Sequence, residues 1–291
     1  MASQQISSRH HYVPQFYLKK WASNGKLWQY QRAPRLGVIK SRLVSTKQTG
    51  FVERLYSFEP EPLSSPNPDD LEHRLSREEE AKAAPVLNKM ISSTSGKLSE
   101  TEKRLWSRFI HIQLDRDPDR IREAVAAADD AFNEIVSQMP RSMESAIKLF
   151  TPSSARNLAL ANLVAPDEDR TDWVNRLAKW AWYRFPAQGF FITSDQPVLL
   201  NSRGAIPVDE ISTITMAISP DLLLICVPTS WETSIDAEWL RTCAITFNAR
   251  LISVRPRYVY SARPITRLPG PNLEKMIDRF LSEPLNQDRA K

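Results

Sequence analysis

Two adjacent histidines near the N-terminus are the first residues whose type suits catalysis. His10 and His11 open the segment HHYVPQFYL. A histidine with a near-neutral pKa is a natural proton donor or acceptor in phosphodiester or glycosidic chemistry. We expect His11 to be catalytic and His10 to bind ligand beside it. A structural role stays open as well, because Pro14 sets a local turn that the His11 ring could cap.

Arg116 is the second candidate, and its spacing places it near a core. It lies four residues after Ile112 and so continues the apolar stripe of a helix. A guanidinium in such a place needs carboxylate, carbonyl or phosphate partners, because it cannot lose its charge. The structural interpretation pairs it with Asp115, Asp117 or Asp195. The functional interpretation makes it a binding site for a ligand phosphate.

The segment FITSDQPV places a hydroxyl and a carboxyl where a strand ends. Ser194 and Asp195 lie two to three residues before Pro197, which stops strand pairing. A carboxylate held there by turn amides is a good acceptor for arginine or histidine. Because no GxSxG elbow surrounds Ser194, we favour Asp195 as the catalytic residue and Ser194 as a ligand-binding one. An Asx turn alone would also explain the pair.

Asn248 carries the last candidate side chain. It follows Phe247 and is flanked on its helix face by Ala244 and Leu251, so its amide points inward. An inward amide has four hydrogen-bonding positions to satisfy. It either bridges two elements or binds the ligand.

No metal site is predicted from the spacing. The four histidines do not stand in HExxH or beside a cysteine pair, which disfavours zinc. An oxygen-rich magnesium site stays open, and no cofactor is assigned. Pro68-Asp69 followed by Glu80-Ala81-Lys82 matches the PD-(D/E)xK nuclease spacing. That chemistry needs a β-hairpin, whereas residues 71–90 read as an acidic helix, so we interpret the match as coincidence on a solvated helical face.

The elements that must position these side chains fall into two kinds. Residues 71–183 have a helical pattern, in which Ser99 and Glu102 form a capping box and Asp117 with Pro118 starts a second helix. The apolar stripe of that second helix holds its spacing for five turns. Its members are Ile121, Val125, Ala128, Phe132, Ile135 and Met139. Further helices are expected over residues 143–150, 155–164, 173–183 and 237–251 and near the C-terminus.

Short strands are expected on both sides of the helical block. They cover residues 27–32, 38–44, 189–193, 197–200, 211–218, 222–227 and 257–261. The expected fold is therefore α+β, with the helical block inserted between N-terminal and C-terminal strands that form one mainly antiparallel sheet. We expect residues 1–291 to form a single domain. Its helical subregion covers about 71–185, and its β-rich subregion covers about 10–58 plus 189–262.

Composition excludes several classes of protein. There are 7 glycines among 291 residues, and none are spaced as GxGxxG or GxxxxGK[ST], which disfavours a Rossmann dehydrogenase or a Walker-type NTPase. Cys226 and Cys243 are too few for a disulfide scaffold. The longest apolar stretch is broken by a charge and two prolines, so no membrane partner is expected. The N-terminus has no apolar signal region, and we expect a cytoplasmic protein.

Charge is concentrated in two segments. Residues 1–60 hold ten Lys or Arg and two acids, and residues 250–267 hold five arginines and no acid, although the whole chain carries only +5. Tyrosine, tryptophan and phenylalanine lie within the same segments. Cations interleaved with aromatic rings suit phosphate contacts and base stacking, so nucleic acid or a nucleotide is the expected partner. The alternative is an ordinary solvated surface.

Several of these segments resemble one bacterial family, the domain of unknown function 4238. The resemblance rests on HHYVPQFYL, FIHIQLDRDPDRI, FITSDQPVLL and CAITFNARLISVRPRYVYS, which occur in that order over about residues 10–262. It implies a stand-alone bacterial or phage-borne protein, with no settled activity. The family's arginine block reads RTPxxR, whereas here Arg116-Asp-Pro-Asp-Arg120 has an aspartate at the threonine position. The resemblance marks His11, Arg116, Asp195 and Asn248 as functional positions.

The leading hypothesis is a nucleic-acid or nucleotide phosphodiesterase whose polar site contains these four residues. Arg116 would hold a phosphate, His11 would transfer the proton, Asp195 would orient either, and Asn248 would bind the ligand. If so, the His11, Arg116 and Asp195 side chains converge on one open pocket. The alternative is a non-catalytic nucleic-acid or nucleotide-binding module, such as a sensor in a bacterial defence or toxin system.

Overall fold

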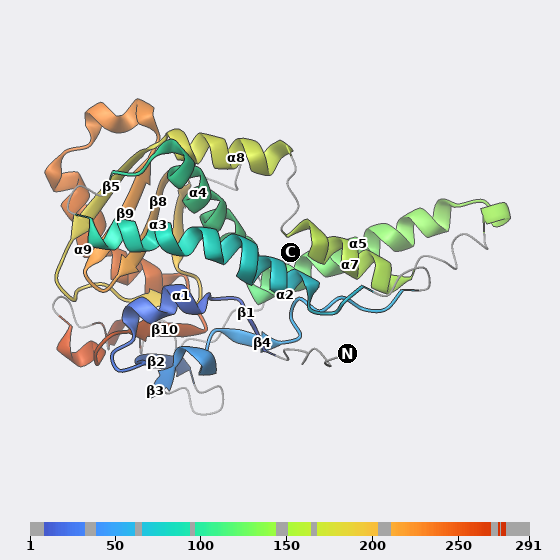
Figure 1. The fold of residues 1–291 in the computed structure, drawn as a ribbon, viewed down its shortest axis with the longest axis horizontal. Helices are drawn as coiled ribbons and strands as arrows, with labels where there is room; N and C mark the ends of the chain where they lie inside the picture. The colour runs from blue at the N-terminus through green and yellow to red at the C-terminus, as the bar shows by residue number, and fades with distance from the viewer. Residues whose placement is uncertain are drawn as a thin grey trace.

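The structure is a computed structural model of the 291-residue chain. It describes residues 9–32, 39–61, 66–93, 97–143, 151–163, 168–202, 211–268, 273 and 275–277. A body of sheets and helices carries a helical arm on one side (Figure 1). The expected α+β class is confirmed, with antiparallel pairing throughout the described sheets.

One sheet joins strands from both ends of the chain. Its order is β3-β2-β10-β6. The strands are β2 (Lys26–Arg32), β3 (Ile39–Ser45), β6 (Thr193–Ser194) and β10 (Tyr258–Ser261). Tyr30 lies opposite Val259 and Trp28 opposite Ser261. The N-terminal hairpin pairs directly with β10, so this sheet contains strands from both sides of the helical block, as the sequence predicts.

The remaining strands form separate sheets, which differs from the single sheet expected. A four-stranded sheet has the order β5-β9-β8-β7, and β1 pairs with β4. These strands are β1 (Arg9–His11), β4 (Phe51–Glu53), β5 (Ala181–Pro186), β7 (Val198–Ser202), β8 (Ile211–Ser219) and β9 (Leu222–Val227). Residues 213–219 and 223–227 are all buried, so both faces of the β8–β9 hairpin are covered. The two edges of this hairpin pair with β5 and β7.

Helices surround this second sheet. Those of the body are α1 (Gln15–Leu18), α2 (Asp70–Arg74), α3 (Ala81–Ser92), α4 (Glu100–Asp115), α8 (Glu168–Lys179) and α9 (Ala237–Ser253). Short 3₁₀ turns lie at η1 (Lys19–Trp21), η2 (Thr46–Gln48), η4 (Arg141–Met143), η6 (Thr229–Ser234) and η7 (Ile265–Arg267). Helices α3, α4 and α9 contact strands of the second sheet. The capping box of Ser99 and Glu102 starts α4 as predicted.

Two segments depart from the expected helices and strands. The helix expected over 173–183 ends at Lys179, because residues 181–186 pair with β9 instead. The strand expected over 189–193 is reduced to Thr193 and Ser194. The helix expected over 143–150 lies almost wholly outside the described residues, as does most of the C-terminal helix.

Helices α5 (Pro118–Gln138) and α7 (Pro152–Asn162) form the arm. They pack against each other and project away from the sheets (Figure 1). Asp117 caps α5 and Pro118 follows it, as predicted. The five-turn apolar stripe is present but little buried, since Ile121 is buried whereas Ile135 is 55% exposed.

The acidic helix expected over residues 71–90 is present and contains a π-helix. Helix α2 continues through η3 (Leu75–Glu80), which is a π-helix, into α3. The nuclease-like residues Glu80 and Lys82 therefore stand on a helix, without the hairpin that the nuclease chemistry needs. No helix in the described ranges is long and apolar enough to cross a membrane.

Candidate functional site

Arg116 is buried at the end of α4, as its spacing predicts, and each nitrogen of its guanidinium donates one hydrogen bond. The side chain is 1% exposed. Its Nε donates to the Tyr56 hydroxyl at 3.2 Å, Nη1 donates to Glu80 Oε1 at 2.9 Å, and Nη2 donates to the His11 carbonyl. Its acidic partner is therefore Glu80, and the expected pairing with Asp115, Asp117 or Asp195 is wrong. The pKa of Arg116 rises above its ordinary value, because the nearby tyrosine and glutamate outweigh the effect of burial.

His11 and Glu72 lie beside this guanidinium. Burial raises the pKa of Glu72 to about 7, and the backbone amide of His11 donates to this carboxyl. Burial, together with the positive charge of Arg116, lowers the pKa of His11 to about 4. Its Nε2 has no hydrogen-bond partner among the described residues. A pKa this low makes the His11 imidazole a weak base near pH 7, whereas acid–base catalysis is most effective when the pKa lies near the working pH.

His10 has a structural environment. It is fully buried, its Nδ1 accepts the Tyr56 amide at 2.9 Å, and its Nε2 lies 3.5 Å from Asp69 Oδ1. An Nδ1 that accepts a hydrogen bond leaves the ring proton on Nε2, facing the aspartate. The acids of the nuclease-like match thus serve other groups, Asp69 facing His10 and Glu80 binding Arg116. Among the described residues, no group of three or more His, Cys, Asp or Glu side chains is placed to hold a metal ion.

Asn248 and Ser194 hold backbone segments in place. Asn248 on α9 accepts from the Ile192 amide at 3.1 Å and donates to the Phe190 carbonyl at 2.8 Å. It thereby bridges α9 and the segment that enters β6, which is the structural role considered for it. Ser194 Oγ bonds both the amide and the carbonyl of Gln196 and closes a local turn.

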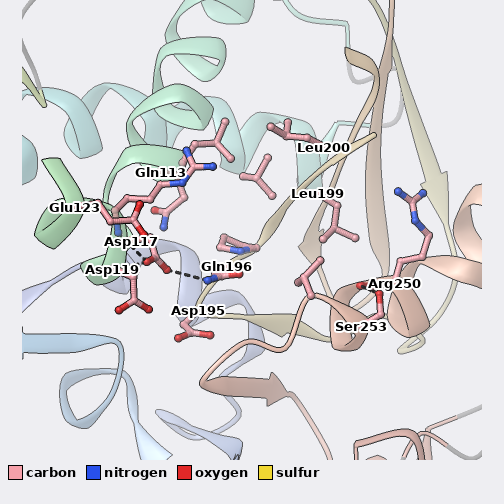
Figure 2. Close-up of a pocket in the computed structure, with 15 residues that line it drawn as sticks. Gln113, Asp117, Asp119, Glu123, Asp195, Gln196, Leu199, Leu200, Arg250 and Ser253 are labelled. Atoms are coloured by element: carbon pink, nitrogen blue, oxygen red, sulfur yellow. Dashed lines mark hydrogen bonds between the residues drawn. The ribbon is translucent and has the colours of Figure 1, made fainter. Parts of the chain in front are cut away.

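Asp195 lines a cavity of about 600 Å³. The cavity lies between the start of α5, the strand β7 and the end of α9 (Figure 2). Its lining residues are Gln113, Leu114, Asp117, Asp119, Arg120, Glu123, Asp195, Gln196, Pro197, Val198, Leu199, Leu200, Arg250, Ser253 and Val254. Carboxylates and amides gather on one side of it, and leucines with Arg250 on the other (Figure 2).

The Asp195 carboxyl is buried and held by neutral donors. It is 2% exposed, and it accepts the Tyr258 amide at 3.1 Å and the Tyr12 hydroxyl at 3.3 Å. Burial raises its pKa to about 7, with a further increase from Asp117, against the lowering effect of the Tyr258 amide. A carboxyl that titrates near neutral pH at the edge of a cavity is suited to accept or donate a proton.

Asp117 fixes the neighbouring corner of the cavity. Its Oδ1 accepts the amides of Asp119 and Arg120 at the start of α5, at 2.8 and 3.4 Å. Its Oδ2 accepts Gln196 Nε2 at 2.9 Å. One aspartate therefore ties the helix start to the turn that follows Asp195.

The predicted site residues make different contacts. Arg116 contacts the His11 carbonyl, and Asp195 accepts from the hydroxyl of the next residue, Tyr12. Of the six predicted residues only Asp195 belongs to the cavity lining described above. Their joint catalytic role stays a prediction.

Sequence reasoning passed over Tyr12, Gln113 and Gln196. Gln113 follows Trp106 and Ile110 at helical spacing and is 5% exposed. A polar residue on the apolar stripe of a helix is the signal that identified Arg116, and the same signal could have identified Gln113. Gln196 contacts Asp117 across 79 positions of sequence, and no local pattern indicates such a pair.

Fold and site define an α+β protein with a carboxylate-bearing cavity at a helix start. The chain belongs to the family described as proteins of unknown function, DUF4238, whose model matches residues 9–263. The resemblance seen in the sequence is therefore confirmed. Asp117 stands where that resemblance expects threonine, and it supplies the helix cap itself. Comparisons with curated proteins and with solved structures gave no match.

Proposed function

We propose that this protein binds nucleic acid through its first sheet. The observation that carries the proposal is that the two basic segments meet there. Residues 1–60 supply β2 and β3, residues 250–267 supply β10, and the three are neighbouring strands. Segments that are far apart in the sequence thus contribute cations and aromatic rings to one sheet.

The register places these groups on one face of the sheet. Tyr258 lies opposite Gln31, which lies opposite Lys40, and Tyr260 lies opposite Gln29, which lies opposite Arg42. Alternate residues of a strand share a face, so these two rows are on the same side.

The outer strand supplies the accessible charge. Lys40 and Arg42 are exposed on the edge strand β3, and Tyr258 is half-buried. Tyr260, whose ring stacks on Tyr258 at 6.1 Å, is fully buried, as is Gln29, so Tyr258 is the accessible ring of these rows. Exposed cations beside a tyrosine suit the backbone and bases of a single strand.

Phosphodiesterase activity stays a prediction with weaker support. Its proposed phosphate holder, Arg116, has every nitrogen bonded within the protein. The cavity beside Asp195 contains Asp117, Asp119 and Glu123, and like charges disfavour a phosphate there. The proposed function is therefore binding without cleavage, in a cytoplasmic protein.

The test is fluorescence polarisation with a labelled single-stranded DNA of mixed sequence, titrated at low and at raised salt. We expect binding at low salt that weakens as salt increases. Lys40→Gln and Arg42→Gln should each weaken binding several-fold and reduce the slope of log K against log salt by about 0.7. The matched control is Lys179→Gln, which removes the same charge from α8 at the opposite side of the body (Figure 1).

Absence of binding at low salt would overturn the proposal, as would Lys40→Gln and Arg42→Gln proteins that bind as wild type does. The same DNA, and an RNA of the same sequence, is then incubated with the protein with and without Mg²⁺ or Mn²⁺. Cleavage that Asp195→Asn abolishes would establish the phosphodiesterase hypothesis instead.

A further inference from the structure

The cavity beside α5 is built to accept hydrogen bonds at one end. Gln113, Asp117 and Asp195 lie on the same side of it, around Gln196 (Figure 2). These three residues come from the end of α4, the α4–α5 link and the turn after β6. We call them the acceptor corner.

The side-chain oxygen of Gln113 receives no hydrogen bond from the described residues. Its Nε2 donates to the Tyr12 carbonyl at 2.9 Å, which fixes the orientation of the amide. Its Oε1 is then buried with no hydrogen-bond partner among the described residues. Leaving a buried acceptor unpaired is unfavourable, so this oxygen is suited to a donor from a bound molecule.

The two carboxylates of the corner are bonded by neutral groups. Asp195 accepts from an amide and a hydroxyl, and Asp117 accepts from backbone amides and from Gln196. Within the described ranges, neither carboxylate forms an ion pair with a Lys, Arg or His side chain. Their negative charge is thus not neutralised by direct contact.

The cations of the lining are engaged elsewhere. Arg250 donates to Asn201, and Arg120 lies 4.0 Å from Asp115. Arg257, whose charge acts on Asp195, is paired with Asp119 at 2.6 Å. The charge at the acceptor corner therefore favours a cation and disfavours a phosphate or carboxylate group.

The facing wall is apolar. Leu114, Val198, Leu199 and Val254 line the cavity, whose volume of about 600 Å³ exceeds that of a small organic molecule. Ligand sites commonly combine such an apolar wall with a few convergent polar groups.

We propose that this cavity binds a small primary amine in its ammonium form, with an apolar body. The ammonium has three N–H donors, which match Gln113 Oε1, Asp117 and Asp195. The apolar body lies against Leu199 and its neighbours. This site is separate from the nucleic-acid surface proposed above and stands without it.

The experiment compares cyclohexylamine with cyclohexanol, which has the same shape and no charge, by calorimetric titration of the full chain at pH 8. At that pH the amine is protonated, and the pH lies above the pKa of about 7 of Asp195. We expect cyclohexylamine to bind at least about tenfold more tightly than cyclohexanol. Cyclohexanecarboxylate should not bind.

Variants locate the site. Asp117→Asn retains a residue that caps a helix well but removes the charge, and it should weaken the amine about tenfold. Gln113→Leu should also weaken it. Asp130→Asn removes one charge from an exposed position of α5 outside the cavity and should change nothing.

Three outcomes would overturn the proposal. These are equal binding of amine and alcohol, no binding of the amine at millimolar concentration, and equal weakening by Asp117→Asn and Asp130→Asn. If Gln113→Leu fails to fold, Asp117→Asn and its Asp130→Asn control still decide the result.

Discussion

Arg116 shows how a single buried charge organises its surroundings. Its three nitrogens bind a tyrosine, a glutamate and a backbone carbonyl that belong to three different segments. Removing one partner of a buried ion pair leaves the other charge uncompensated, at a cost of about 3–5 kcal/mol. The Arg116–Glu80 pair therefore fixes where the acidic helix sits against β1.

Asp195 should make stability depend on pH in an unusual direction. Its pKa is about 7 in the folded protein, above the ordinary carboxyl value of 3.8. Between these two values the folded protein holds a proton that the unfolded chain has released, so the free energy of unfolding falls as the pH rises through that window. Asp195→Asn removes this difference in bound protons between the folded and unfolded chains.

We therefore expect Asp195→Asn to gain stability relative to wild type as the pH rises from 5 to 8, by at least about 2 kcal/mol. Urea unfolding at both pH values measures it. Glu72 also titrates near 7, but it is present in both proteins and cancels in the difference. Parallel pH profiles for the two proteins would contradict the assignment.

Single residues could be predicted from sequence only as far as local spacing reaches. The inward position of Arg116 followed from the stripe of its own helix, and the bridging role considered for Asn248 followed in the same way. The residues that Arg116 and Asn248 contact could not be predicted from this spacing. Glu80 is 36 positions from Arg116, and only the packing of one helix against another brings the two together.

At the scale of elements, the π-helix Leu75–Glu80 connects α2 to α3 and determines which side of each helix faces the core. Leu75 and Ala83 are both buried although they are eight positions apart, a spacing that turns about 80° past two turns of a regular α-helix. The wider π turn takes up the additional residue and brings both onto the core face. Glu72 and Glu80, also eight apart, face Arg116 for the same reason.

Deleting Arg77, an exposed residue of the π-helix, should therefore destabilise the protein more than removing its side chain by Arg77→Ala does. A one-residue deletion rotates the two halves by about 100° and moves Glu80 or Leu75 away from its partner. We expect a loss of at least about 3 kcal/mol in the free energy of unfolding, measured in urea. The control is Arg77→Ala, which keeps the length and should stay within about 0.5 kcal/mol of wild type. Equal stability of the two variants would refute this role.

Elements with local signals were predictable, and elements that depend on distant partners were not. The caps of α4 and α5 lie within a few residues of each helix start, so sequence alone locates them. The end of α8 was misplaced because residues 181–186 are helix-compatible but pair with β9. The division into separate sheets likewise depends on pairings that no local pattern reveals.

At the scale of the whole molecule, stability should be uneven. Along α5, the buried residues are Pro118 and Ile121, both in its first turn. On the other helix of the arm, Leu158 is 64% exposed. By contrast, α4 buries six residues against the body. Local opening is favoured where little apolar surface is buried.

Hydrogen–deuterium exchange should reveal this difference. Amides of α5 beyond Val125 should exchange faster than those of α4, whereas the strands β8 and β9 should be the most protected. Peptide-level mass spectrometry measures it. Equal protection of α4 and the outer half of α5 would show that the arm is stabilised by something other than its burial.

The pairing of β2 with β10 also has a consequence for how the chain is made. During translation the hairpin of β2 and β3 leaves the ribosome long before β10, which is the partner of its inner edge and lies more than 200 residues later. Until then that edge presents unpaired amides and carbonyls, at which a nascent chain can join a wrong partner. Closing a contact between such distant segments is slow. The surface proposed to bind nucleic acid is thus completed only after Tyr258–Ser261 has been synthesised.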